Sequence, residues 1–141
     1  MDMFLFCLVN SDYIMFVELI TEYLKNKLKE NIVFMKHYQN IYDYIGCSLF
    51  DMYIESKYTS KECDSEFTLE EYQISTNVSI YINIFTEKIN DGLYVIKEIV
   101  ESLGDSFDTN IILEDDSSAV VYINACNRHY VNKAFWNQKV E

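Results

Sequence analysis

The chain has 141 residues, of which half are hydrophobic and 16% are aromatic, including 12 Tyr and 9 Phe. This length predicts a single domain over residues 1–141 that buries its own core, and the aromatic content excludes a disordered chain. The net charge of −12 excludes nucleic acid and anionic membranes as partners and favours a basic protein, because phosphate groups are bound by clustered Lys and Arg.

The cysteines and the first residues bear on the cellular compartment. Cys7, Cys47, Cys63 and Cys126 lie far apart without a Cys-x-x-Cys pair, which disfavours a zinc or redox site and suits a reducing cytoplasm. Asp2 stands where a signal peptide would carry positive charge, and polar residues interrupt the apolar window that follows. We therefore expect a cytoplasmic protein with neither a signal peptide nor a membrane span.

The beginning of the chain predicts a strand followed by a helix. Residues 3–9 are a continuous apolar run, which is typical of a strand buried on both faces. Ser11 or Asp12 can cap a helix that ends near Asn31, because apolar residues recur at helical spacing between them. Residues 32–40 show no pattern that assigns them.

An aromatic strand is predicted next, over residues 41–55. Its apolar positions change face midway, so Gly46 is expected to hold a bulge or a sharp twist. Residues 56–71 are polar and acidic, and they are expected to form a long hairpin connection to the following strand.

That following strand, at residues 74–85, has the clearest pattern in the chain. Ile and Val alternate with Ser and Asn at a period of two, which predicts a long, central antiparallel strand. Asn90 or Asp91 then begins a second helix, and Gly104 is expected to end it as a C-cap.

Two further strands are predicted near the end of the sequence. Residues 110–113 and 119–124 have strand-like composition and flank an acidic turn at residues 114–118. Residues 127–141 mix polar and aromatic side chains and fit no single element.

The order of these elements predicts an α+β two-layer sandwich. An antiparallel sheet would carry both helices on one face, in the ferredoxin-like βαββαβ plan with an extra C-terminal strand. The other face would stay uncovered and would present Tyr42, Tyr44, Tyr53 and Tyr81 to a partner or to a second copy of the chain.

The sequence offers little catalytic chemistry. It contains no glycine-rich phosphate loop, nucleophile elbow or His-Glu-x-x-His motif. Cys126 and His129 could meet on one helical turn, but a Cys-x-x-His pair is more often structural. Glu114, Asp115 and Asp116 lack calcium-loop spacing and are better explained as a solvated turn. We expect neither an enzyme nor a bound cofactor or metal.

The remaining candidate site is the acidic, tyrosine-rich surface. Carboxylates beside Tyr are well suited to docking on a cationic protein, because Tyr gives contact area at low entropy cost and acids accelerate encounter. Solvated strand edges would have the same composition. The partner-binding residues expected on this basis are Asp43, Asp51, Tyr53, Glu55, Tyr58, Glu66, Glu70, Glu71, Asp115 and Asp116.

The small size, the acidity and the aromatic segments IYDYIGCSLFDMYIE and VSIYINIF resemble the small acidic immunity proteins of bacterial toxin systems, including contact-dependent growth inhibition. This resemblance covers most of the chain without a diagnostic motif. It implies an inhibitor that binds a cognate toxin, often a basic nuclease, and occludes its active or substrate-binding site.

Three alternatives stay open at this point. A phage-encoded inhibitor of a host nuclease would use the same physics of binding. A homodimeric regulatory domain that binds a small molecule would instead have a concave apolar pocket. An enzyme would need Cys126, His129 and an acid within hydrogen-bond reach.

Overall fold

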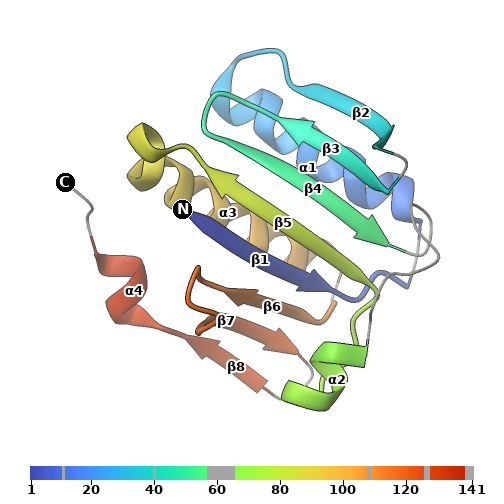
Figure 1. Cartoon of the computed structure of the whole chain (residues 1–141), viewed down its shortest axis with the longest axis vertical. Helices are drawn as coiled ribbons and strands as arrows, with labels where there is room; N and C mark the ends of the chain where they lie inside the picture. The colour runs from blue at the N-terminus through green and yellow to red at the C-terminus, as the bar shows by residue number, and fades with distance from the viewer. Residues whose placement is uncertain (11, 40, 57–65, 108, 126–127, 139–141) are drawn as a thin grey trace.

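The computed structural model describes residues 1–10, 12–39, 41–56, 66–107, 109–125 and 128–138. The described strands form one antiparallel sheet of eight strands in the order β2-β3-β4-β5-β1-β6-β7-β8 (Figure 1). The strands are β1 (Asp2–Cys7), β2 (Val33–Tyr38), β3 (Tyr42–Gly46), β4 (Phe50–Ser56), β5 (Val78–Ile84), β6 (Ile111–Glu114), β7 (Val120–Ala125) and β8 (Arg128–Val131). The helices are α1 (Tyr13–Leu28), α2 (Glu66–Tyr72), α3 (Ile89–Phe107) and α4 (Lys133–Asn137), with a 3-10 turn η1 at Thr86–Lys88.

Strands β1 and β5 pair along their whole length at the centre of the sheet, with Leu5 opposite Ile80 and Phe4 opposite Tyr81. The period of two in β5 therefore places Ile80 and Ile82, both fully buried, on one face and Tyr81 on the other. The prediction of a central antiparallel strand is confirmed, but the strand begins at Val78 and not at Ile74, which instead packs in a second cluster with Ile112 and Ile123. Strand β1 also alternates, so the expectation that it is buried on both faces is wrong for Phe4 and Phe6.

Helices α1 and α3 cover the face that carries the isoleucines, behind the sheet in Figure 1. Phe16, Ile20 and Leu24 of α1 join Ile96 and Val100 of α3 in one core with that face. Asp12 caps α1, since its carboxylate accepts a hydrogen bond from the Ile14 amide at 2.9 Å. Helix α1 ends before the predicted Asn31, because Lys29 turns into the left-handed conformation.

The predicted α+β class with an antiparallel sheet is confirmed. Strands β4 and β1 each lie antiparallel to β5, and β6 lies on the other side of β1. Four inner strands therefore stand in the order β4-β5-β1-β6, with α1 and α3 in the connections. Strands β2 and β3 extend the sheet on one side and β7 and β8 on the other, which exceeds the expected layout without conflicting with it.

Residues 41–55 form a hairpin, so the prediction of one strand with a bulge is wrong. β3 ends at Gly46 and β4 begins at Phe50, and the Cys47 amide donates to the Phe50 carbonyl at 3.1 Å to close the turn. The change of apolar face therefore marks a reversal of the chain. Gly46 has no room for a side chain, because a Cβ there would lie 2.3 Å from the Tyr44 hydroxyl.

Two other boundaries differ from the expectations. Part of the predicted hairpin connection is helix α2, while residues 57–65 lie outside the described residues. Gly104 does not end its helix, because α3 continues to Phe107. A Cβ at Gly104 would lie 2.7 Å from the side-chain nitrogen of Asn124 on β7, which is the flexible end of that side chain.

Helix α2 covers one end of the second face. Phe67 and Tyr72 pack there against each other and, through Phe67, against Phe6 of β1. Beneath them Ile112 and Ile123 form a second, smaller cluster with Ile74 and Ala125. Among the described residues, α2 therefore covers the face opposite α1 and α3 over β6 and β7, and no described element covers it over β3, β4, β5 and the start of β1 (Figure 1).

The predicted turn at residues 114–118 is confirmed between β6 and β7. The tail, which the sequence left unassigned, forms β8 and α4, and the Trp136 indole donates to the Val121 carbonyl at 3.0 Å. Within the described part of the chain, no helix is long and apolar enough to cross a membrane.

Gly92 supplies a test of the packing between α3 and β5. A Cβ at Gly92 would lie 2.6 Å from a methyl group of Ile84, which is fully buried and stiff. Gly92→Ala gains about 1 kcal/mol of helix propensity but overpacks the core by about 1–3 kcal/mol. We expect a net loss in the free energy of unfolding, measured by urea denaturation.

Gly104→Ala is the matched control. Its nearest atom is the flexible end of the Asn124 side chain, which can rotate away. We expect this variant to be as stable as the wild type or more stable. A stabilised Gly92→Ala protein would contradict the close contact with Ile84.

Candidate protein-interaction face

The open part of the sheet carries a continuous surface of aromatic rings, which we call the aromatic face. One row crosses adjacent strands from Tyr44 to Tyr53, Tyr81 and Phe4, because these residues pair directly across β3, β4, β5 and β1. Tyr38 and Tyr42 lie beside this row. The aromatic face consists of Phe4, Tyr38, Tyr42, Tyr44, Tyr53 and Tyr81.

The rings support one another. Ring centroids are 5.3 Å apart between Tyr44 and Tyr53, 5.8 Å between Tyr53 and Tyr81, and 5.5 Å between Tyr81 and Phe4. Tyr38 and Tyr42 also contact Tyr53, at 6.1 and 5.9 Å. Tyr53 therefore contacts four other tyrosines, and these tilted arrangements are favourable for aromatic pairs.

Carboxylates hold the hydroxyl groups at both ends of the row. The Tyr44 hydroxyl donates to Asp51, and the Tyr81 hydroxyl donates to Asp2 Oδ1 at 2.7 Å. Burial, and then the hydrogen bond to Asp51, raise the pKa of Tyr44. The hydrogen bond to Asp2 and partial burial raise the pKa of Tyr81 to about 12. Both tyrosines therefore stay protonated at neutral pH and act as donors.

The four strands that carry the row contain acids and no bases, whereas β2, which carries Tyr38, has Lys36 and His37. Strands β1, β3, β4 and β5 carry Asp2, Asp43, Asp51 and Glu55 but neither Lys, Arg nor His. Three of these carboxylates, those of Asp2, Asp51 and Glu55, lie on the same face of the sheet as the rings. Such a surface attracts positive charge.

Not all the predicted binding residues lie on this surface. Asp51, Tyr53 and Glu55 are half-buried on the strands of the aromatic face. Asp43, however, is only 3% exposed, and its oxygens accept hydrogen bonds from the Tyr13 hydroxyl at 2.7 Å and the His37 amide at 3.1 Å. We therefore give Asp43 a structural role, because it points to the helix face together with Ile45.

The other predicted residues lie away from the aromatic face. Glu70 and Glu71 are exposed on α2, which Glu66 begins; the Glu66 side chain and the whole of Tyr58 lie outside the described residues. Asp115 shapes the turn between β6 and β7, where its Oδ1 accepts from the Ser117 and Ala119 amides at 2.9 and 3.0 Å. Asp116 is exposed in the same turn.

Sequence reasoning missed Tyr38, Phe4 and Asp2 as members of this site. Tyr38 lies in the segment that no pattern assigned. Phe4 and Asp2 alternate with the buried Met3 and Leu5, and this period of two could have placed them on the open face.

Of the two residues considered for catalysis, the structure describes His129 alone. Cys126 lies outside the described residues, and His129 on β8 contacts the edge of the Tyr122 ring at 6.0 Å. Among the residues that the structure describes, no group of three or more His, Cys, Asp or Glu could hold a metal ion.

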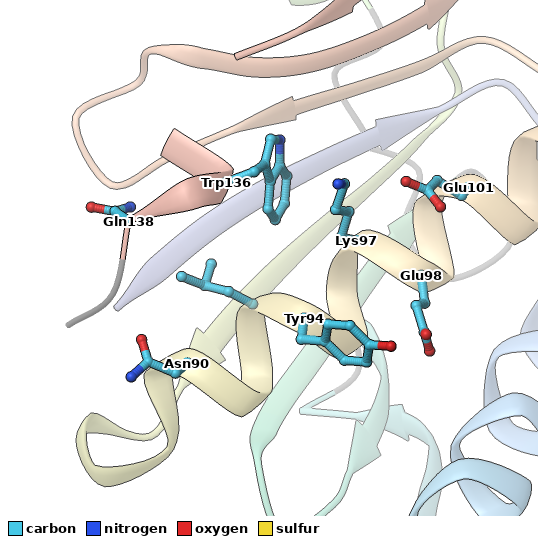
Figure 2. A pocket seen from close by; sticks show the side chains of 8 residues that line it. Asn90, Tyr94, Lys97, Glu98, Glu101, Trp136 and Gln138 are labelled. Carbon is cyan, nitrogen blue, oxygen red and sulfur yellow. The ribbon is translucent and has the colours of Figure 1, made fainter. Parts of the chain in front are cut away.

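A groove of about 570 Å³ lies between α3 and the end of the chain (Figure 2). Figure 2 shows the Lys97 amine beside the Trp136 indole, and this amine lies 5.9 Å from the ring centroid. Glu98 turns away toward α1, where it accepts from Tyr23 and pairs with Lys27 at 3.4 Å. The groove is thus lined by side chains of both charges, and Glu98 is already occupied.

No family model, curated protein or solved structure matches this chain.

The hydrogen bond between Tyr81 and Asp2 can be tested by titration. Folding raises the pKa of the Tyr81 hydroxyl from 10.0 to about 12. The hydrogen bond therefore stabilises the fold fully below about pH 10, and this contribution to stability is lost as the pH rises through 12. We expect Asp2→Asn to lower the pKa of Tyr81 toward its ordinary value, measured by NMR of the ring carbons. Asp116→Asn, which removes a distant charge, should leave it unchanged. An unaltered Tyr81 titration in Asp2→Asn would contradict the contact.

Proposed function

We propose that this chain is an inhibitor of the immunity-protein type, which binds a basic protein toxin in the cytoplasm and occludes its active or substrate-binding site. The observation that carries the proposal is the aromatic face, whose row of three tyrosines and Phe4 crosses four adjacent strands that contain acids and no bases. The resemblance in size, acidity and aromatic strands to immunity proteins supports the same role.

The aromatic face has the two properties that such binding requires. Tyr rings supply large contact area, and those already packed against neighbours lose little side-chain freedom when a partner arrives. Tyr53 is the expected anchor because it lies at the centre of the surface, in contact with four other rings. Energetically dominant residues concentrate near the centre of an interface.

The acids provide the attraction for a cationic partner. Asp2, Asp51 and Glu55 flank the rings, and they would pair with Lys and Arg that otherwise hold substrate phosphates. A net charge of −12 also accelerates the encounter with a basic protein. Inhibition would then be stoichiometric, because the chain blocks access without performing chemistry.

The first test neutralises the acids of the aromatic face. We expect Asp2→Asn, Asp51→Asn and Glu55→Gln together to slow association with the basic partner and to weaken the salt dependence of binding. The partner is obtained by capture on the tagged protein at low salt, identified by mass, purified and assayed for an activity that the chain inhibits. Association rates are measured by surface plasmon resonance over a range of salt concentrations.

A matched control variant separates the site from the overall charge. Glu18→Gln, Glu101→Gln and Asp105→Asn remove the same three charges from exposed positions on α1 and α3, so both triple variants have a net charge of −9 in place of −12. The proposal requires the control to bind faster than the face variant. Equal rates, or capture of no protein that the chain inhibits, would refute it.

The second test removes the central ring. We expect Tyr53→Ala to weaken binding by about 2 kcal/mol, roughly thirtyfold, chiefly through faster dissociation. Tyr94→Ala on α3, which truncates an exposed tyrosine on the opposite side, should bind as the wild type does. Circular dichroism and urea unfolding of both variants show whether the fold is retained. Unchanged dissociation in a folded Tyr53→Ala protein would exclude the aromatic face as the binding site.

A further inference from the structure

Strand β2 ends the sheet on the side away from β8, at the top of Figure 1. Its described pairing is with β3 alone, so its outer main-chain groups are those of an edge strand. An edge strand can pair with a strand from another chain unless charge, a bulge or a covering element prevents it.

Large hydrophobic side chains gather at this edge. We use the name apolar edge for Ile14, Val33, Phe34, Met35 and Ile41. Their side chains are between 40% and 62% exposed, and they make up half of the ten exposed large hydrophobic residues in the described part of the chain. Phe34 and Ile14 also line a groove of about 520 Å³ between β2 and the start of α1. Exposed apolar patches of this kind mark interaction sites.

The opposite edge of the sheet is built differently. β8 begins with Arg128 and His129, both exposed, and α4 follows it directly. Charged side chains on an edge strand discourage pairing with another chain. On β2, the features that discourage pairing with another chain begin only after Met35, where the register shifts and His37 adopts a positive φ of 57°. Val33, Phe34 and Met35 stay regular and uncharged.

The net charge at the apolar edge favours a second copy of the chain as the molecule that binds there. Helix α1 carries two Glu and two Lys, β2 carries Lys36, and Asp12 caps α1, so together they sum to zero in a chain of −12, and the buried Asp43 also lines the groove. A basic partner would find less net negative charge there than on the rest of the chain. A second copy would meet little net repulsion at this edge, where Asp51, two strands in from Val33 on the same face, is the nearest acid of the aromatic face.

We propose that β2 pairs antiparallel with β2 of a second copy, giving a two-fold dimer joined at the apolar edge. The arrangement is self-complementary, because a two-fold axis beside Phe34 brings Val33 of each copy opposite Met35 of the other. Phe34 lies on the helix face, as its partner Ile45 does, so the two Phe34 rings meet beside the two grooves.

The direction of the two-fold axis sets how the two aromatic faces of the dimer are oriented. A two-fold axis that relates two antiparallel edge strands stands perpendicular to the sheet, so the aromatic faces of both copies lie on the same side. The dimer therefore offers two binding surfaces to its surroundings. The proposal itself is independent of what the aromatic face binds.

The test is the oligomeric state of the purified chain. We expect sedimentation equilibrium to show a monomer–dimer equilibrium, and Val33→Lys with Met35→Lys to raise the dimer dissociation constant about tenfold or more. Tyr130→Lys on β8 is the control, because Tyr130 and Met35 are both 46% exposed on the two outer strands. This control should dimerise as the wild type does. A wild-type monomer at millimolar concentration would overturn the proposal.

Hydrogen exchange locates the interface without relying on the variants. Amides of β2 should gain protection as the protein concentration rises, while those of β8 should not change. Concentration-dependent protection of β8 or of the strands beneath the aromatic face would place the dimer elsewhere and overturn the proposal. Protection of β2 only after a basic partner is added would assign the apolar edge to that partner, which also overturns it.

Discussion

The register between β1 and β5 is the constraint on which the rest of the molecule depends. Pairing of Leu5 with Ile80 and of Phe4 with Tyr81 sorts the side chains of both strands into a helix-covered face and an open face. A slip by one residue would turn every isoleucine of β5 outward and every ring inward. The hydrophobic core and the aromatic face are therefore two results of one register, and the cost of exposing the core keeps the rings in place.

Regular patterns explain what could be predicted from the sequence. The period of two found β5, helical stripes found α1 and α3, and the acidic turn between β6 and β7 was evident from composition. The β3–β4 hairpin was missed because its turn at residues 47–49 lacks the glycine and asparagine that usually mark one. Helix α2 was missed because seven residues are too few to show a helical period.

The candidate site was predictable by residue type but not by position. Asp51, Tyr53 and Glu55 were named because they belong to an acidic, tyrosine-rich segment, and in the structure they lie half-buried on the same face of β4. Asp43 was included for its charge alone, although its spacing from Ile45 places it on the buried face. Tertiary contacts decide whether each acidic side chain is buried or exposed. Sequence spacing predicts this only within a strand whose register is known.

Tyrosine hydroxyls are frequent hydrogen-bond donors to carboxylates in this acidic chain, a role that Lys and Arg often have in other proteins. Five tyrosines donate to carboxylates in the described residues, at Tyr13–Asp43, Tyr23–Glu98, Tyr44–Asp51, Tyr72–Glu114 and Tyr81–Asp2. The same part of the chain has two salt bridges, which both lie on the helix side. A hydroxyl satisfies a carboxylate oxygen without cancelling its charge. A salt bridge would have fixed the aromatic face equally well and neutralised it. Tyrosine donors therefore let the same carboxylates order the rings and still attract a cationic partner.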